Sequence, residues 1–323
     1  MGLLRKRLLA LLRGRPVSVL AAYYLLVRPL SIGATERVGP WGPRWLARIA
    51  SLLLTRLLGK VGRVPLRSVS YVDRDAIDPC KQHLVVWHPH GPFTTMAFMH
   101  CGRLSATGEP LTFYPGIAPF LFDVPVFREL ALLLNARSVD ARVISSLAQA
   151  GMHVGIQPGG VPEQVQSDHT REVAVFPPRR GFVRTAMRHG ARLLPVYIFG
   201  ENQAYTTSDA GRQIAAATMR RLGVPLPVVQ GRFGLPWLVP KPVDVHLCWG
   251  RPVDAGPPNA HPTDEEVEEV FVRYVAELRR VFDANAKRCL PADVAAKGLS
   301  IIDRRDGRGS EGVPVALALR SRL

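Results

Sequence analysis

The stretch Leu84-Val85-Val86-Trp87-His88-Pro89-His90-Gly91 decides the fold of this 323-residue chain. Its first four residues are a compact apolar run, which predicts a short buried strand, and a polar turn follows without a break. Further strand patterns lie at 111–114, 153–157, 173–176, 193–199 and 243–249, and helical patterns at 94–101, 126–135, 141–150 and 180–189. Strands that alternate with helices predict an α/β fold with a central, mostly parallel sheet flanked by helices.

Composition and pattern divide the chain into three parts. Residues 1–64 are basic and apolar, residues 65–290 carry the strands and helices of a catalytic domain, and residues 291–323 are predicted to form a loosely structured tail. The last long helix of the middle part begins at Thr263-Asp264-Glu265-Glu266, a capping box preceded by Pro262. Hydrophobic residues make up 47% of the chain and charged residues 21%, which excludes a disordered protein.

The positive charge is concentrated at the N-terminus. The first 70 residues hold 13 Lys or Arg and one acid, Glu36, whereas the rest of the chain is nearly balanced. An apolar run at 16–27 is flanked by Arg15 and Arg28, but twelve helical residues span only ~18 Å of a ~30 Å hydrocarbon core. The stretch 44–58 places Trp and Leu on one face and arginines on the other. Both stretches predict a helical segment that associates with a membrane surface.

Three alternatives to membrane attachment account for the basic N-terminus less well. A cleaved transit peptide would also be Arg-rich and free of acids, although this leader has little Ser. An amphipathic core helix would account for 44–58 but not for both stretches. Nucleic-acid binding is not expected, because the basic residues are interleaved with Leu rather than with stacking aromatic residues. The four cysteines show neither a metal-binding spacing nor a C-x-x-C pair, so they are predicted to be reduced thiols.

Two histidines follow the first apolar strand, at the sheet edge where α/β proteins bind ligands. A neutral imidazole accepts protons at physiological pH, so His88 or His90 would serve as a general base. Pro89 fixes its own φ, and Gly91 lets the backbone approach a substrate. Two alternatives remain: the histidines would satisfy backbone groups in a turn, or they would be metal ligands, for which no third ligand is nearby in the sequence.

Two further polar segments are candidates for binding. Gly159 and Gly160 follow another apolar strand, where their N–H groups would be open to an oxyanion, and Glu163 would orient an imidazole. A tight turn followed by a solvated acid is the simpler interpretation of that segment. Arg180 and Arg184 lie on a predicted helix that opens after two prolines; they suit phosphates, although such charges more often line a solvated helix face.

Taken in order, these segments resemble the type 2 diacylglycerol acyltransferase family, and its plant and algal branch in particular. The resemblance runs from His88 to about Lys287. The matching blocks are His88-Pro-His-Gly91 with Phe98, Phe127-Arg128-Glu129, Pro158-Gly-Gly-Val-Pro-Glu163, Glu172-Val-Ala174, Arg180-Gly-Phe-Val-Arg184, Arg188-His-Gly190, Leu194-Pro-Val196, Phe199-Gly-Glu-Asn202, Leu238-Val-Pro-Lys-Pro242, Gly250-Arg-Pro252 and His261-Pro-Thr263.

The resemblance implies an enzyme with a glycerolipid-acyltransferase-like fold. Such an enzyme transfers a fatty acyl group from acyl-CoA to diacylglycerol and forms triacylglycerol, without a cofactor, a metal or an acyl-enzyme. Carried over to this chain, it makes His90 the base, His88 a supporting residue and Glu163 the group that orients the imidazole. The remaining assignments are oxyanion donors near Gly91, Gly159 and Gly160, and contacts to the CoA phosphates from Arg128, Arg180 and Arg184.

The resemblance also sets expectations for the setting of the enzyme and leaves its acceptor open. It implies the endoplasmic reticulum membrane and lipid droplets, and the acid-free leader also allows a plastid membrane. Monoacylglycerol, a lysophospholipid or a long-chain alcohol would be alternative acceptors, and a non-catalytic protein of the lipid-droplet surface is the alternative of a different class. A His-x4-Asp pair is absent, since Thr95 lies five residues beyond His90, so Glu163 is the expected acid.

Overall fold

The computed structural model describes residues 23–61, 66–71, 77–94, 111, 113–234 and 239–304. The predicted helix at 94–101 lies outside these ranges except for its first residue. Residues 16–22 of the apolar run and residues 305–323 of the predicted tail also lie outside these ranges.

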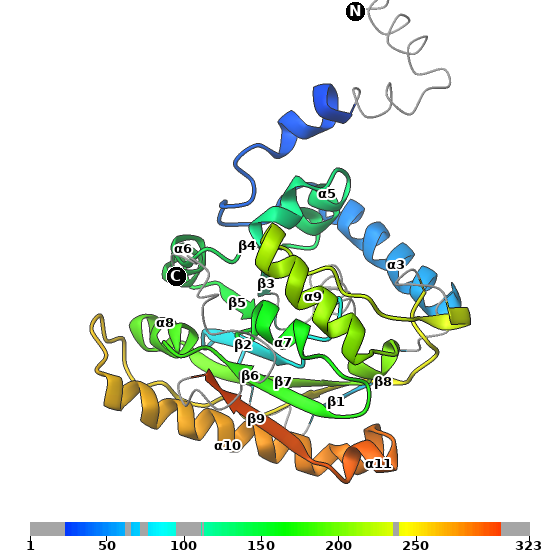
Figure 1. Cartoon of the computed structure of the whole chain (residues 1–323). Coiled ribbons are helices and arrows are strands. Elements are labelled where there is room, and N and C mark those ends of the chain that lie inside the picture. The colour runs from blue at the N-terminus through cyan, green and yellow to red at the C-terminus, as the bar shows by residue number, and fades with distance from the viewer. Residues whose placement is uncertain are drawn as a thin grey trace, which may run out of the picture.

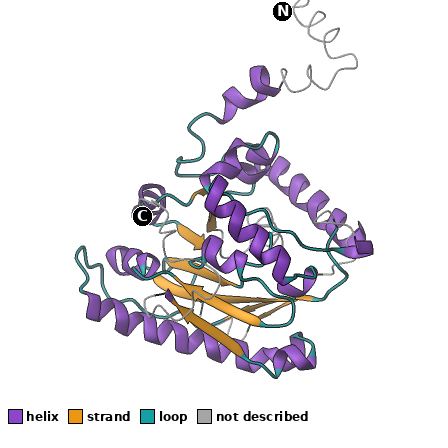
Figure 2. Ribbon diagram, in the orientation of Figure 1, coloured by secondary structure: helices purple, strands orange, loops and turns teal. Residues whose placement is uncertain are grey.

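A seven-stranded sheet forms the centre of the molecule (Figure 1; Figure 2). Every neighbouring pair of strands is parallel except β7 and β8, which are antiparallel. The prediction of a mostly parallel sheet is therefore confirmed. In order across the sheet, the strands are β1 (Leu66–Tyr71), β8 (Val245–Trp249), β7 (Arg192–Phe199), β2 (His83–His88), β5 (His153–Ile156), β3 (Phe113–Ile117) and β4 (Arg137–Ser138).

Helices cover both faces of this sheet. Along β2, Leu84 and Val86 point into the large core beneath α6, α8 and α10, whereas Val85 and Trp87 point into a second core that Leu54 of α3 covers. Burial on both faces explains why the strand sequence is continuously apolar rather than alternating. The helices are α3 (Arg44–Val61), α5 (Phe127–Leu133), α6 (Ala141–Gln149), α7 (Gly160–Val165), α8 (Gly181–His189), α9 (Asp209–Leu222), α10 (Asp264–Cys289) and α11 (Ala292–Ala295).

Two helix ends show capping residues that were recognisable in the sequence. α10 begins at a complete capping box: Glu266 N–H donates to Thr263 Oγ1 (3.2 Å), and Thr263 N–H donates to Glu266 Oε2 (2.8 Å). α8 ends at Gly190, which adopts a φ of +63° in the left-handed region that closes helices. The elements that were predicted agree with their observed ranges to within a few residues, whereas β1, α7 and α9 were not predicted.

The predicted loose tail is wrong for the residues up to Asp303. α11 follows α10 directly, and β9 (Leu299–Asp303) pairs in parallel with β6 (Glu172–Phe176) as a separate two-stranded sheet. Arg180 forms an ion pair with Asp303 while its guanidinium lies 3.6 Å from the centroid of the Phe271 ring. The hydrophilic composition after residue 303 obscured a short strand whose partner lies far earlier in the chain.

The N-terminal segment is attached to the fold through α5. Tyr23 and Ser31 both donate to the buried carboxylate of Glu129, and the Arg128 guanidinium binds the hydroxyl and carbonyl oxygens of Ser31. This segment comprises a π-turn, η1 (Tyr23–Val27), and a 3-10 turn, η2 (Arg28–Ser31). No helix in the described part of the chain combines the length and the apolar character needed to cross a bilayer.

We predict that Asp303→Asn lowers the free energy of unfolding by roughly 2–3 kcal/mol, because it removes the nearer of the two carboxylates beside the buried Arg180 and leaves only Glu268, 4.0 Å from Nε. Urea unfolding measures this loss. Asp283→Asn on the exposed side of α10 is the matched control and should cost almost nothing. Equal losses in the two variants would contradict the assignment of β9 to the folded core.

Candidate active site

The two glycine-containing turns predicted from the sequence meet at one edge of the sheet. β2 ends at His88 and its parallel neighbour β5 ends at Ile156, so the chain leaves both strands on the same side. The Gln164 side chain donates to the carbonyl of Pro92 (2.7 Å) and thereby joins the segment after β5 to the segment after β2. The α/β topology therefore brings together two segments that are distant in the sequence.

Glu163 is the centre of this edge. Its side chain is 3% exposed, and the carboxylate accepts hydrogen bonds from the backbone N–H groups of His90 (2.6 Å, Oε1) and Val175 (2.8 Å, Oε2). The Nδ1 atom of His88 lies 3.2 Å from Oε2 and 3.3 Å from Oε1. A single buried carboxylate thus holds β2, the His-x-His turn and β6 in place.

His88 is a buried partner of this carboxylate. It is fully buried, and because a carboxylate only accepts hydrogen bonds, Nδ1 is the donor to Glu163. Nε2 has no hydrogen-bond partner within the described part of the chain, and the ring packs edge-on against Phe176 at 5.1 Å between centroids. This placement supports the sequence prediction of a supporting residue, since a substrate has no path to the ring.

His90 has the accessible imidazole of the pair. Its side chain is only partly buried, and Nδ1 lies 3.1 Å from the carbonyl oxygen of Gly91 and 3.0 Å from Thr94 Oγ1. The Thr94 hydroxyl donates to the carbonyl of His90 (3.1 Å), so it accepts from Nδ1. Because a carbonyl oxygen only accepts, Nδ1 is the donor to Gly91, and in the neutral ring Nε2, 3.4 Å from Thr94 Oγ1, is the acceptor. Burial lowers the pKa of His90, although the carbonyl of Gly91 and the charge of Glu163 raise it in part.

The prediction that Glu163 orients the imidazole of His90 needs a correction. The carboxylate contacts the ring of His88 and only the backbone N–H of His90. It therefore fixes the turn on which His90 stands, and the ring itself is oriented by Gly91 and Thr94. Sequence spacing could not distinguish these two arrangements, because both histidines lie within two residues of each other.

The three glycines of the predicted site have different roles. A Cβ at Gly159 would lie 2.6 Å from the Cβ of Glu163, so this glycine makes room for the carboxylate. Gly91 has a φ of +64°, and a Cβ there would lie 2.9 Å from Glu201 Oε1. Gly160 also has a positive φ, and its N–H donates to the carbonyl of Gln157 (3.1 Å). That N–H group is therefore already bonded and does not face an oxyanion.

Two buried carboxylates near the turn were not predicted as site residues. Glu201 packs against Gly91 and is 2% exposed. Glu172, on β6, accepts hydrogen bonds from Tyr197 (2.7 Å), Asn202 (2.8 Å) and Gln203 (2.8 Å). Burial raises the pKa of Glu172 to about 7, against the opposing effect of these donors. Both lie in blocks that carried the family resemblance, which was the only signal for them in the sequence.

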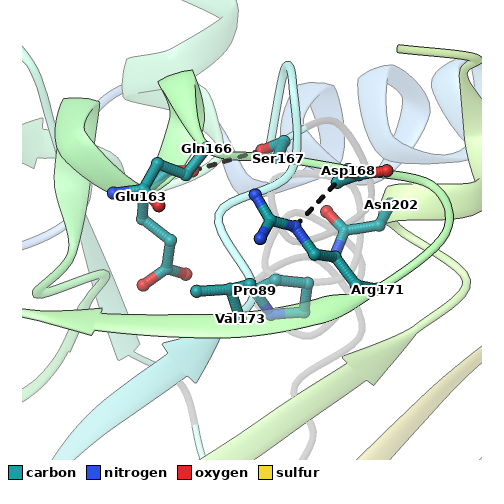
Figure 3. A pocket seen from close by; sticks show the side chains of 8 residues that line it. All are labelled: Pro89, Glu163, Gln166, Ser167, Asp168, Arg171, Val173 and Asn202. Carbon is teal, nitrogen blue, oxygen red and sulfur yellow. Dashed lines mark hydrogen bonds and ion pairs between the residues drawn. The ribbon is translucent and has the colours of Figure 1, made fainter. Parts of the chain in front are cut away.

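A small pocket opens beside Glu163 and Pro89 (Figure 3). Its empty volume is only about 170 Å³ with open solvent included, so it does not hold a substrate by itself. Figure 3 shows the Glu163 side chain reaching from α7 toward Pro89 and Val173. The other residues that line it are Gln166, Ser167, Asp168, Arg171 and Asn202.

The three arginines predicted to contact CoA phosphates make contacts within the chain. Arg128 is buried against Ser31, and its Nη1 donates to the carbonyl of Phe122 (3.3 Å); burial lowers its pKa. Arg180 is buried against Asp303 and Phe271. Arg184 pairs with Asp264 and donates to the carbonyl of Pro262 (3.0 Å). Burial leaves the Arg128 and Arg180 guanidinium groups closed to a CoA phosphate in this structure, whereas Arg184 is paired but partly exposed, and its assignment stays a prediction.

The metal alternative for the two histidines finds no support in the described part of the chain. No group of three or more His, Cys, Asp or Glu side chains there is arranged to hold a metal ion. His88 and His90 point to different partners, the one to Glu163 and the other to Gly91 and Thr94.

We predict that Glu163→Gln lowers the free energy of unfolding by about 2–3 kcal/mol, because the amide places N–H donors against backbone N–H donors in a buried site. Chemical denaturation measures the loss, and Glu269→Gln on the exposed face of α10 is the matched control. A variant as stable as this control would show that the carboxylate does not organise the turn.

Comparisons with known proteins identify the family. The family model described as diacylglycerol acyltransferase matches residues 65–295. Human 2-acylglycerol O-acyltransferase 3 is 30% identical over 68% of this chain and 69% of its own length, and human acyl-CoA wax alcohol acyltransferase 1 is 33% identical over 64% and 67%. Diacylglycerol O-acyltransferase 2 of Dictyostelium discoideum is 26% identical over 85% of this chain and 88% of its own length.

The family model covers well over half of the chain, and the match spans about two thirds of each human relative. The family predicted from the ordered sequence blocks is thus confirmed. It is a family of acyltransferase enzymes, and the chain belongs to it: the diacylglycerol acyltransferase family.

Proposed function

We propose that this chain transfers a fatty acyl group from acyl-CoA to the hydroxyl group of a lipid acceptor, with diacylglycerol as the acceptor and triacylglycerol as the product. The observation that carries the proposal is the arrangement at His90: a partly buried imidazole with a protonated Nδ1 and an accepting Nε2, on a turn fixed by Glu163. The family relationship supplies the substrate classes, since relatives are named for monoacylglycerol, wax alcohol and diacylglycerol acceptors.

In the proposed reaction, His90 Nε2 removes the proton from the acceptor hydroxyl as its oxygen attacks the thioester carbonyl. The tetrahedral intermediate then collapses, the C–S bond breaks, and the imidazolium returns the proton to the departing thiolate. No covalent enzyme intermediate is required, because the base activates the acceptor directly. A low pKa suits this base, since the imidazole is then neutral and ready to accept a proton at physiological pH.

The supporting groups follow from the contacts at the turn. Gly91 and Gly159 stay candidates for backbone donors to the oxyanion, whereas the N–H of Gly160 is already bonded to Gln157. Arg171 lines the pocket beside Glu163 and is about half exposed, so although it pairs with Asp168 (3.3 Å) it is more open to a CoA phosphate than Arg128, Arg180 or Arg184. This part of the proposal replaces the assignments made from sequence.

An acceptor dissolved in lipid requires the enzyme to reach a membrane. α3 supports such contact, because Trp45 (63%), Leu52 (55%) and Leu53 (62%) are strongly exposed on it. Large apolar side chains on one face, with arginines on the same helix, suit the interface of an anionic membrane. We propose that the endoplasmic reticulum membrane is the site of action.

We predict that His90→Asn lowers kcat by about 10²–10⁴-fold with purified protein, acyl-CoA and diacylglycerol in mixed micelles. His88→Asn is the matched comparison: its amide still donates to Glu163, so its activity should stay within about tenfold of the wild type. A larger loss of kcat in His88→Asn than in His90→Asn would instead assign the role of base to His88.

The pH dependence tests the same assignment. Because burial lowers the pKa of His90, the base stays neutral below pH 6.5, and kcat/KM should fall only below that pH. The measurement is a profile of kcat/KM from about pH 4.5 to 8, with unfolding followed in parallel. An acid limb with a midpoint above about 6.5 would contradict a desolvated imidazole as the base.

We predict that diacylglycerol is used more efficiently than other acceptors by the same preparation. Monoacylglycerol, a lysophospholipid and a long-chain alcohol are offered at equal surface concentration with labelled acyl-CoA, and kcat/KM is compared. A preference for another acceptor would correct the substrate while leaving the mechanism intact. A well-folded protein without activity on any acceptor would support a non-catalytic role.

A further inference from the structure

We infer that the loop after α9 is a second membrane-contact surface, separate from the N-terminal segment, that binds an anionic lipid bilayer. The surface consists of the exposed side chains of Leu222, Val224, Leu226, Val228 and Phe233, and we call it the α9-loop surface. The inference rests on the proposed function only in that a lipid acceptor must be reached from a membrane.

The exposed apolar side chains are not needed to hold the loop in place. Between residues 224 and 229 the side chains alternate, with Pro225 and Val229 buried and Val224, Leu226 and Val228 facing outward. Val229 packs in a cluster with Ala204 and Tyr205. The outward residues therefore contribute little to folding. Single exposed apolar side chains need no explanation, but five of them within residues 222–233 indicate another contact.

The backbone presents this surface in a defined shape. Leu226 N–H donates to Thr218 Oγ1 (2.8 Å) of α9, and Gln230 and Thr206 exchange two backbone hydrogen bonds (2.8 and 2.9 Å). Phe233 is 77% exposed and adopts a φ of +61°, which is unusual for a residue with a side chain. The loop thus holds Phe233 outward in a strained backbone conformation. This arrangement does not stabilise the folded protein in water.

The positive charge near the α9-loop surface favours an anionic bilayer as its partner. Residues 210–243 contain five Lys or Arg and no acid, although the chain beyond residue 70 is nearly balanced overall. One of the five, Arg212, is paired with Asp168 and Asp209. Arg220 and Arg221 are exposed directly beside Leu222, and the Arg232 guanidinium lies 4.6 Å from the centroid of the Phe233 ring. Leucines and phenylalanine between arginines match the acyl and headgroup layers of an anionic membrane.

A second copy of the chain fits this surface less well. A symmetric dimer would place the same patch on both sides of the contact, so Arg220 and Arg221 would face their own equivalents without any acid from 210–243 to offset them. An anionic bilayer instead supplies the missing negative charge. The two occupants therefore make opposite predictions about lipid charge.

The first test measures how the full chain, diluted out of detergent, partitions onto vesicles of phosphatidylcholine with and without phosphatidylserine. The double variant Leu222→Asp with Leu226→Asp should lower partition onto the anionic vesicles about tenfold. Val272→Asp is the matched control, because Val272 is an exposed valine on α10, which runs along the lower edge of the molecule away from α9 (Figure 1).

The same vesicle-partition measurement tests the contribution of Arg220 and Arg221. Arg220→Gln with Arg221→Gln should lower the gain from phosphatidylserine about tenfold, whereas Arg273→Gln with Arg279→Gln on the exposed side of α10 should leave it unchanged. Acyl transfer in mixed micelles separates this inference from the proposed function, since all these variants should retain wild-type kcat there. Loss of micellar activity in the wild type itself would count against the function and not against the surface.

Hydrogen exchange gives a readout without any substitution. Amides in 222–234 should exchange more slowly when anionic vesicles are added, while those of α10 should not change. Unchanged partition in the variants together with unchanged exchange in the loop would overturn the inference. A variant that keeps its partition but loses a dimer in analytical ultracentrifugation would also overturn it, because the surface would then bind a second copy.

Discussion

The buried carboxylate of Glu163 is the constraint on which the site depends. It is 3% exposed, and three donors from different elements converge on it: the ring of His88, the N–H of His90 and the N–H of Val175. A buried charge is costly unless hydrogen bonds satisfy it, so each of these donors stabilises the carboxylate and is positioned by it in return. The result is a fixed turn at the carboxyl end of β2.

The two histidines of that turn have different environments and therefore different chemistry. His88 is fully buried and donates to Glu163, whereas His90 is partly buried and keeps Nε2 available. One imidazole is therefore enclosed within the turn, and in the proposed reaction its neighbour is the one that acts on the substrate. Gly91 permits this arrangement, because a side chain there would collide with Glu201.

Much of the order of strands and helices could be read from local patterns, because the strand at 84–87 is buried on both faces and the capping box at Thr263 has a fixed spacing, but β1, α7 and α9 were missed. The two histidines and Glu163 could be selected for the same reason: they follow apolar strands. Local patterns could not identify the partner of each group.

The pairing of β9 with β6 joins segments that are distant in the sequence. Glu163 contacts His88 rather than the His90 ring because of a turn geometry that sequence spacing does not determine. Charge alone misplaced Arg180, since a guanidinium that packs on Phe271 beside Asp303 looks the same in sequence as one that binds phosphate.

The protonation state of His90 is the sharpest test of its role as the base. Nitrogen-15 NMR of the histidine-labelled chain in micelles, with the His90 signals assigned by their loss in His90→Asn, reports which ring nitrogen carries the proton. We expect a neutral ring at about pH 7 with the proton on Nδ1 and a titration midpoint below 6.5. A proton on Nε2 at that pH would contradict this role, because Nε2 would then have no lone pair with which to take the proton of the acceptor hydroxyl. A midpoint above about 6.5 would contradict the desolvated imidazole.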